Sequence, residues 1–270
     1  MRLTSASPII SLLTDFGLKD PYAAEMKAII LNLCPNARII DISHLIEKFN
    51  VCMSAFILAS ASPYFPKGTI HVEVVDPAVG TKRRALLVET EEAYYIGPDN
   101  GVLMLAAKKQ KIKHVYGITN KQYMLPKVSQ TFHGRDIFAP AAAHLAEGCR
   151  PDTFGPEIKD YLVPKFAQPR LSQGELTGEM LHIDDFGNII TNISKNHLEK
   201  IGVTEGSRLR IKLGKKVACI RFGSTYGEVK AKTALALIGN HDFLEIAVNQ
   251  GNASEWFNSK IGTNVILSCF

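Results

Sequence analysis

The chain has 270 residues, of which 46% are hydrophobic, and its formal net charge is +5. This length and composition predict one large domain or two ordinary ones with full hydrophobic cores. This net charge is mild and lacks the concentrated basic stripe of a nucleic-acid binder, so we expect no nucleic acid as a partner. No apolar run approaches the ~20 residues that span a bilayer, so we expect no membrane either.

Strand and helix patterns alternate in the first half of the chain. Apolar and β-branched runs predict strands at residues 8–13, 38–42, 70–75, 85–88, 93–96 and 113–116. Apolar spacing predicts helices between residues 21 and 34, at residues 51–61 and 102–108, and after residue 136. This alternation predicts an α/β layer structure with a mainly parallel sheet.

The composition changes after Glu147. Residues 148–173 contain several prolines and little periodicity, which predicts an extended linker. Short strands are then expected at residues 179–183, 208–213, 217–222, 235–238, 244–248 and 264–267, with one short helix at residues 195–201. This pattern predicts a small β-barrel or sandwich. We therefore divide the chain into residues 1–168, which include the linker from about residue 148, and residues 169–270.

Polar side chains lie where the strands of the first half are expected to end. Asp15 follows the first strand, Asp76 and then Arg83 follow the third, Asp99 follows the fifth, and His133 precedes a helix. Ligands of open α/β sheets bind where strand ends converge, so we expect these residues to meet in one site. Taken singly, each also fits an ordinary turn aspartate or a structural histidine.

The common motifs for phosphate binding, for a serine nucleophile and for zinc are missing from the sequence: GxGxxG, GxxxxGK[ST], GxSxG and HExxH. Among the polar residues at the expected strand ends of the first half, only His133 pairs with a nearby acid, Asp136, and the surrounding arginines oppose a cation, so we expect no catalytic metal. The five cysteines form no Cys-x-x-Cys pair, and the first residues are too polar for a secretory signal. These features predict a cytoplasmic protein.

One turn of the second half stands out. Residues 183–192, IDDFGNIITN, combine two acids, an aromatic ring and two asparagines. Asparagine supplies both a donor and an acceptor, which suits the edge of a nucleobase, and Phe186 offers a stacking face. A plain Asp/Gly/Asn hairpin turn is the alternative. A second Gly-Asn turn is expected after residue 248.

Taken together, these features resemble the S-adenosylmethionine (SAM) hydroxide adenosyltransferases, which are hydrolases related to the SAM-dependent fluorinase and chlorinase. The resemblance rests on six segments in family order: LLTDFGLKDPYAAEMKAII, VVDPAVGTKRR, IGPDNGVL, FHGRDIFAPAAAHLA, IDDFGNIITNI and LEIAVNQGNAS. It implies an N-terminal α/β/α domain, a C-terminal β-barrel-like domain, and a homotrimer with active sites at the subunit interfaces. It also implies that SAM is the substrate, that water attacks ribose C5′ to give adenosine and methionine, and that no cofactor is used.

The resemblance implies three catalytic residues, Asp76, Arg83 and His133. Arg83 is expected to stabilise developing hydroxide, while Asp76 or His133 orients the water and accepts its proton; which of the two is the base stays open. The halogenating relatives carry Tyr in place of Asp76 and Ser in place of Gly134, so hydrolysis is favoured over SAM-dependent halogenation. A non-catalytic SAM- or adenosine-binding protein is a further alternative. Ala78 replaces a family glycine, which leaves the shape of the loop open.

Motif positions also imply the residues that bind substrate. Asp15 is expected to bind the ribose hydroxyls, and Asp20 and Asp184 the methionine ammonium group. Phe49 and Phe132 are expected to pack against the ligand. Recognition of adenine is expected from four residues of the second half: Phe186, Asn188, Asn252 and Ala253.

Overall fold

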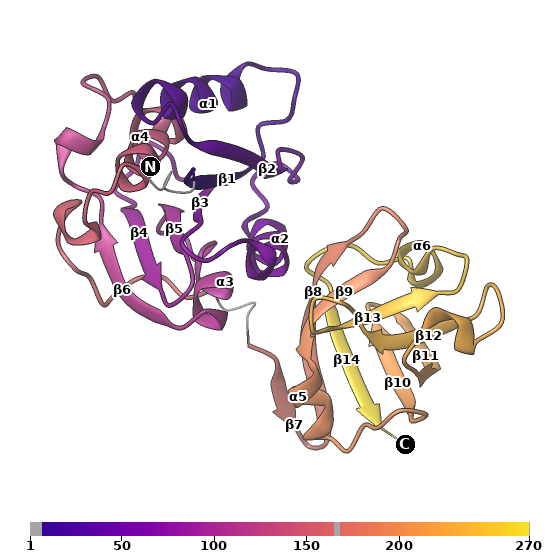
Figure 1. Ribbon diagram of the computed structural model, residues 1–270. Coiled ribbons are helices and arrows are strands. Elements are labelled where there is room, and N and C mark those ends of the chain that lie inside the picture. Colours follow the sequence, from indigo (N-terminus) through magenta and orange to yellow (C-terminus); the bar gives the residue numbers. More distant parts are fainter. Residues whose placement is uncertain (1–6, 165–167, 270) are drawn as a thin grey trace, which may run out of the picture. The chain divides into compact units, whose positions relative to one another are not determined.

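The computed structural model describes residues 7–164 and 168–269. They fall into two compact units, which divide after Pro164, and each unit has its own sheet and its own hydrophobic core (Figure 1). None of the helices in the described ranges is both long and apolar enough to cross a membrane.

The first unit is built on a six-stranded sheet with the order β2-β1-β3-β5-β4-β6. Its strands are β1 (Ile9–Thr14), β2 (Arg38–Ser43), β3 (Ile70–Val74), β4 (Ala85–Thr90), β5 (Tyr94–Pro98) and β6 (Ile112–Gly117). The pairs β1–β2, β1–β3 and β3–β5 are parallel, whereas β4 is antiparallel to β5 and β6. The mainly parallel sheet is therefore confirmed, but the sheet is mixed because a three-residue turn joins β4 to β5 as a hairpin.

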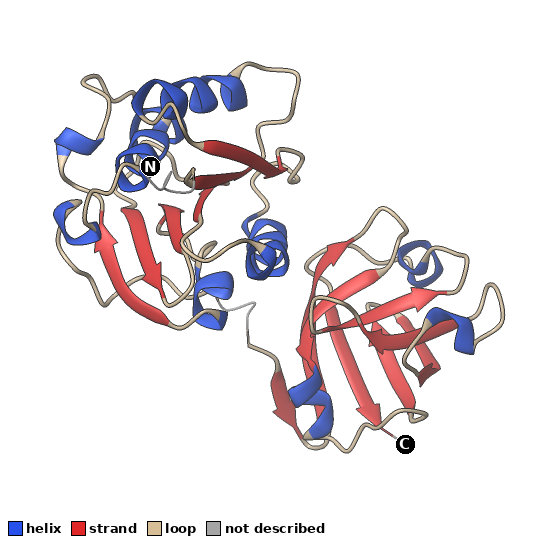
Figure 2. Cartoon of the chain, viewed as in Figure 1, coloured by secondary structure: helices blue, strands red, loops and turns tan. Residues whose placement is uncertain are grey.

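Helices cover both faces of this sheet (Figures 1 and 2). On one face α1 (Tyr22–Leu33) packs against α4 (Ala139–Ala146), and on the other α2 (Val51–Ala61) packs against α3 (Met104–Lys109). A π-helical turn, η3 (Gly134–Phe138), leads directly into α4. The expected α/β/α layers are confirmed. Short 3₁₀ turns occupy η1 (Ser62–Tyr64), η2 (Lys121–Tyr123) and η4 (Pro151–Thr153).

Much of the segment expected to be an extended linker packs against the first unit instead. The buried Phe154 joins the hydrophobic core, where its ring stacks on Tyr123 with the centroids 4.2 Å apart. Glu157 forms a β-bridge with Tyr116, and the Leu162 N–H donates to Asp99 Oδ1 at 2.9 Å. The prolines leave only short regular elements here, such as η4, but they do not prevent burial. Residues 165–167 of this segment lie outside the described ranges.

The second unit is a closed β-barrel with the strand order β14-β10-β11-β12-β13-β9-β8, because β14 also pairs with β8. Its strands are β8 (Glu175–Ile183), β9 (Ile189–Ser194), β10 (Arg208–Leu213), β11 (Lys216–Phe222), β12 (Ala234–Ile238), β13 (Phe243–Val248) and β14 (Asn264–Cys269). A short β7 (Arg170–Ser172) extends the sheet beside β8. The barrel is therefore confirmed over the sandwich. The helical turns of this unit are α5 (Lys195–Glu199), η6 (Tyr226–Glu228) and α6 (Ala253–Phe257).

Several elements of the second unit differ from the expectation, among them β7, which lies at the end of the segment predicted as an extended linker. β9 begins at Ile189, inside the segment predicted as a turn, and α6 begins where a Gly-Asn turn was predicted. The side chain of Asn252 accepts a hydrogen bond from the Glu255 N–H at 3.0 Å and so caps α6. Asparagine favours both turns and helix N-termini, and the local pattern does not separate the two.

Candidate active site

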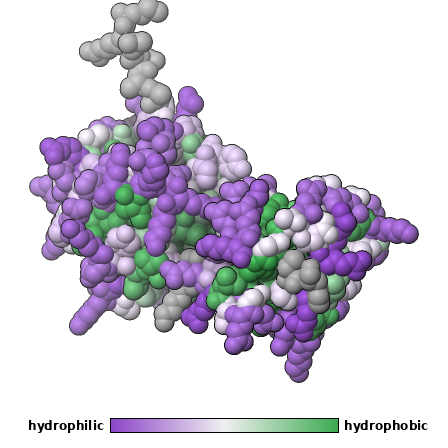
Figure 3. All heavy atoms as spheres, turned by 90° about the horizontal axis from the view of Figure 1, so that it is seen from below, coloured by the Kyte–Doolittle hydropathy of each residue, from purple (hydrophilic) through white to green (hydrophobic). Residues whose placement is uncertain are grey.

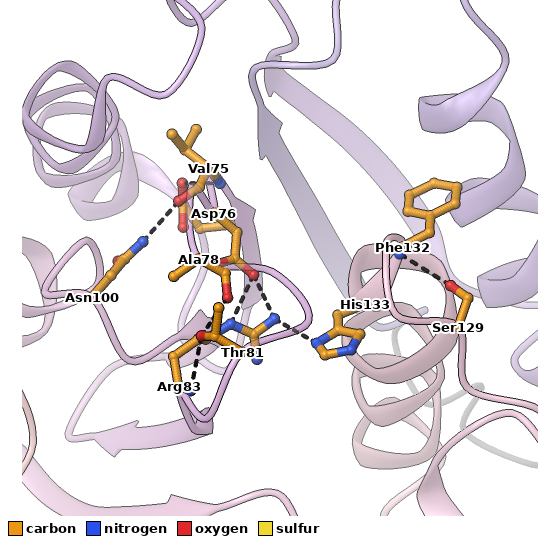
Figure 4. A network of polar contacts seen from close by, with 10 residues as sticks. Val75, Asp76, Ala78, Thr81, Arg83, Asn100, Ser129, Phe132 and His133 are labelled. Atoms are coloured by element: carbon orange, nitrogen blue, oxygen red, sulfur yellow. Dashed lines mark hydrogen bonds and ion pairs between the residues drawn. The ribbon is translucent and has the colours of Figure 1, made fainter.

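The ends of β1 and β3 bring two acids to one edge of the sheet. Thr14 is level with Val74 in the parallel register, so the residues that follow these strands leave the sheet side by side. The side chain of Asn100 donates to the Val75 carbonyl at 2.8 Å and holds the chain just before Asp76 (Figure 4). Asp15 and Asp76 therefore reach the edge where α/β sheets bind their ligands.

A cavity of about 340 Å³ opens at this edge, a volume within the usual range for small-molecule sites. Its walls contain six of the first-unit residues that the sequence predicted for the site, namely Asp15, Asp20, Phe49, Asp76, Phe132 and His133, whereas Arg83 and Asp99 do not line it. The predicted residues thus come together, although the segments that carry them are far apart in the chain.

Arg83 lies between Asp76 and His133 (Figure 4). Its Nε donates to Asp76 Oδ2 at 2.8 Å, and its Nη2 contacts both the same oxygen and, at 2.6 Å, His133 Nδ1. The side chains of Arg83 and Asp76 are only 7% and 4% exposed. The ring of Phe138 lies 5.4 Å from the guanidinium carbon. The ion pair is therefore largely shielded from water, with Asp76 in the cavity wall and Arg83 behind it.

The contact with Arg83 also fixes the state of His133. A guanidinium group only donates, so Nδ1 of the ring accepts, and the neutral ring carries its proton on Nε2. Burial and then the charge of Arg83 lower the pKa of His133, which favours the neutral ring. Among the described residues, buried Asp76 Oδ1 has no hydrogen-bond partner. This oxygen is consequently the open acceptor of the three residues.

Two aromatic residues that the sequence analysis did not select complete one wall of the cavity. Phe16 and Tyr22 pack edge-to-face against Phe132, with ring centroids 5.5 and 5.2 Å away. Both residues lie in the same sequence motif as Asp15 and Asp20, so their position beside the predicted acids was the available signal.

Arg84 and Asp99 serve the fold rather than the cavity. Arg84 Nε donates to Asp99 Oδ2 at 2.8 Å, and Nη1 donates to Asp160 Oδ1 at 2.7 Å. Asp99 does not line the cavity, so the expectation that it converges there with Asp15 is wrong. The second arginine of the loop holds Asp99, and with it the segment around Asp160.

Glu73 is a buried acid that the sequence analysis missed. Its side chain lies in β3 with no exposed surface, and its Oε1 accepts from Ser54 Oγ at 2.7 Å and from the Val75 N–H at 2.8 Å. Burial raises its pKa well above the usual range, and the nearby charges of Asp15 and Asp76 act in the same direction. An acid inside the apolar run IHVEVV was the signal that could have identified it.

In the second unit, the turn between β8 and β9 is ordered by Asp184. Its Oδ1 accepts from the backbone N–H groups of Phe186 at 3.0 Å and Asn188 at 2.8 Å, and its Oδ2 accepts from the side-chain amide of Asn188 at 2.9 Å. The ring of Phe186 is 80% exposed. The turn is therefore locally fixed and presents an unburied aromatic face.

The start of α6 packs onto the same turn. The Ser254 N–H donates to the Gly187 carbonyl at 3.0 Å. A Cβ atom on Gly187, whose φ is +82°, would lie 2.2 Å from Asn252 Cγ, so this close approach requires glycine. The structure thus groups the residues predicted to bind adenine in one cluster: Phe186, Asn188, Asn252 and Ala253. Within the described residues of both units, no three His, Cys, Asp or Glu side chains form a group that could hold a metal ion.

These features define a two-domain protein in which an α/β/α layer structure precedes a closed β-barrel. Residues 10–155 match the SAM hydroxide adenosyltransferase N-terminal domain, and residues 178–266 match the C-terminal domain of the same family. The chain therefore belongs to the SAM hydroxide adenosyltransferase family.

The sequence similarity to individual relatives extends over most of the chain. The (R)-S-adenosyl-L-methionine hydrolase of Methanocaldococcus jannaschii is 38% identical over 257 residues, which cover 93% of this chain and 92% of that protein. The fluorinase of Nocardia brasiliensis is 29% identical, with 96% of each chain covered. The crystal structure of an uncharacterized conserved protein from Thermotoga maritima superposes with a TM-score of 0.89 at 37% identity, covering 96% of this chain and 99% of that one.

Proposed function

We propose that this protein hydrolyses SAM to adenosine and L-methionine, with Asp76, Arg83 and His133 as the catalytic residues. One observation carries the proposal beyond family membership: a buried carboxylate in the wall of the cavity has one oxygen fixed by Arg83 and the other without a partner among the described residues.

The reaction that we propose is a single displacement. The water oxygen forms a bond to ribose C5′ while the C5′–S bond breaks, and the electron pair of that bond stays on sulfur. The sulfonium leaves as neutral methionine, so the leaving group needs no activation by a metal or cofactor. The protein has to align the water with the C5′–S bond and receive its proton.

Asp76 is the proton acceptor in this proposal. His133 Nδ1 already accepts from Arg83, whereas Asp76 Oδ1 is open. Arg83 holds the carboxylate in place and stabilises the negative charge that develops on the water oxygen. His133 positions the guanidinium group through the 2.6 Å contact.

The binding roles follow the chemistry of the side chains. In the first unit, Asp15 binds the ribose hydroxyls, Asp20 binds the methionine ammonium group, and Phe49 and Phe132 pack against the ligand. In the second unit, Asp184 also binds the methionine ammonium group. The adenine ring stacks on Phe186, and its edge is recognised by Asn188, Asn252 and Ala253.

We extend the homotrimer of the family to this chain, with each active site shared between the first unit of one subunit and the second unit of its neighbour. Large apolar side chains that reach the surface support this assembly, among them Leu18 and Phe49 of the first unit and Phe186 of the second. Figure 3 shows hydrophobic groups at the surface of both units within a mostly hydrophilic covering. A mass in solution of three times 29.7 kDa is expected from light scattering, and a monomer would contradict the assembly.

Halogenation is the rival reaction, and two features oppose it. The charge of Asp76 repels a halide ion. A Cβ atom on Gly134 would lie 3.2 to 3.3 Å from atoms of Met26, Phe132 and Val74, so there is little room for the serine that the halogenases carry at this position.

Product analysis tests the proposed function. The protein is incubated with each sulfonium epimer of SAM in separate reactions, with and without chloride or fluoride, and the products are separated by liquid chromatography. Because the M. jannaschii relative is named for the (R) epimer, we expect that epimer to give adenosine and methionine in equal amounts at every halide concentration. A 5′-halo-5′-deoxyadenosine product would establish halogenation. Unchanged SAM with both epimers, bound equally by the wild type and Asp76→Ala, would establish a binding protein.

A further inference from the structure

Lys48 lies in the wall of the cavity but has no part in the function proposed above. Among the described residues that line the cavity it is the one lysine or arginine, and it shares the cavity with the carboxylates of Asp15, Asp20 and Asp76. Its ammonium group donates a hydrogen bond to the main-chain carbonyl of Asp15. The charged ammonium group of Lys48 is therefore held next to Asp15, to which we assign the binding of the ribose hydroxyls.

The loop that carries Lys48 is anchored to the end of β1. The Gly17 N–H donates to the His44 carbonyl at 2.7 Å, and the Ile46 N–H reaches the Thr14 carbonyl at 3.4 Å. The buried ring of His44 adds a hydrogen bond of 2.8 Å between its Nδ1 and Thr14 Oγ1. These contacts fix where the loop presents its side chains.

The next residue ties the loop to the carboxylate itself. The Phe49 N–H donates to Asp15 Oδ2 at 2.9 Å, and Phe49 has a φ of +65°. A bulky residue rarely adopts this left-handed conformation, which persists only where the surrounding structure imposes it and often marks a functional site. Lys48 and Phe49 thus hold the carbonyl and the carboxylate of Asp15, and both line the cavity.

We propose that Lys48 binds the ribose hydroxyls of the substrate together with Asp15. This inference rests on the proposed function, because it deepens the recognition of the same nucleoside. Each hydroxyl group is both a donor and an acceptor, whereas a carboxylate only accepts. The hydroxyls donate to Asp15, and their oxygen atoms accept from Lys48, whose ammonium group has three N–H bonds and uses one on the Asp15 carbonyl. Lys48 is thereby a binding residue that is specific for a nucleoside with an intact vicinal diol.

Calorimetric titration of the full-length protein with adenosine and with 2′,3′-dideoxyadenosine tests this role. The variants are Lys48→Met, which keeps the apolar stem of the side chain, and Lys67→Met, a control in the same unit whose side chain is 70% exposed and pairs with Glu92. Loss of a charged donor to the hydroxyls is expected to raise the Kd of adenosine about tenfold in Lys48→Met. The Kd of dideoxyadenosine is expected to stay within twofold of wild type, and Lys67→Met is expected to bind both like the wild type.

The remaining outcomes separate this inference from the proposed function. If Lys48→Met weakens the binding of both nucleosides equally, Lys48 only supports the loop. If it weakens the binding of neither, Lys48 does not touch the ligand. Both results overturn the inference and leave SAM hydrolysis standing. If the wild type binds no adenosine at all, the inference fails, and the product analysis described above decides the proposed function separately. A double-variant cycle adds a second readout: Asp15→Asn and Lys48→Met should together raise the adenosine Kd by less than the product of their separate effects, because both contact the same diol. Independent effects in that cycle would contradict a shared ligand group.

Discussion

The candidate catalytic residues of the first unit and the candidate adenine-binding turn of the second are built by opposite means. Arg83 pairs with Asp76 in a nearly buried ion pair and contacts the neutral ring of His133, 50 positions away in the sequence. Asp184 orders a turn through contacts that reach at most four residues along the chain, and it leaves the Phe186 ring 80% exposed. The first arrangement depends on the whole sheet and its ion pair is nearly buried, whereas the turn of the second is ordered mainly by local contacts, with one hydrogen bond from the start of α6, and its aromatic ring is exposed. Substitutions in the first should therefore change the rate of the reaction, and those in the second should change affinity.

The largest effect is expected from Asp76→Asn, which keeps the shape of the side chain but removes the proton acceptor. We expect kcat to fall by about 10²–10⁴-fold with little change in KM, measured as adenosine formation under saturating SAM. Asp160→Asn is the matched control, because it alters an 81% exposed aspartate that pairs with the neighbouring Arg84, and its kcat should stay within twofold of wild type. An Asp76→Asn enzyme with more than a tenth of wild-type activity would assign the base elsewhere.

A smaller and different effect is expected from Phe186→Ala. Loss of one stacking ring should raise KM about five- to tenfold and leave kcat within twofold. Tyr64→Ala, which removes a 77% exposed ring of the first unit, serves as the control and should change neither constant. An equal loss of kcat and kcat/KM in Phe186→Ala would break the division between rate and affinity.

Glu73 tests how strongly burial controls the first unit. Its pKa is raised in the folded protein above the ordinary value of 4.5, so the folded state keeps a proton that the unfolded chain releases. Its contribution to stability is complete below pH 4.5 and is lost as the pH rises above that value. Glu73→Gln keeps the acceptor for Ser54 and Val75 without a titrating group. The melting temperature of Glu73→Gln minus that of wild type should therefore increase as the pH rises from 5 to 9. Parallel curves for the two proteins would show that Glu73 is not held protonated.

The smallest effect is expected from Ala78→Gly in the loop between β3 and β4. Ala78 has no positive φ, whereas Gly80 of the same loop has a φ of +76°. Alanine therefore fits its position, and the loop needs glycine only at residue 80. We expect the free energy of unfolding to fall by less than about 1 kcal/mol and kcat/KM to stay within twofold. A gain in activity above fivefold would indicate that alanine distorts the loop.

The same contrast explains what the sequence could predict. Asp15 and Asp76 were predictable because each directly follows a clear apolar strand, and parallel strand ends converge. The closure of the barrel could not be predicted from strand patterns. The β14–β8 pair joins the two ends of the second unit, and strand patterns carry no information about such distant pairing. The choice between Asp76 and His133 as base also stayed open, since it depends on which ring nitrogen meets Arg83 in the folded chain.

Residues outside recognisable motifs were harder to identify. Lys48 resembles any solvated lysine of a turn until its loop is seen to fold back onto Asp15. Phe154 lies among prolines that indicate a linker, yet its ring enters the core. In both cases the deciding contacts are tertiary, and local sequence preferences do not encode them.

Oxygen-18 labelling tests the central claim, attack of water at ribose C5′, most directly. The protein is allowed to convert SAM in water enriched in oxygen-18, and the adenosine and methionine formed are examined by mass spectrometry. We predict one labelled oxygen in the 5′-hydroxyl group of adenosine, none in methionine, and loss of the labelled product in Asp76→Asn. Unlabelled adenosine, or label in the amino-acid product, would contradict hydrolysis at C5′.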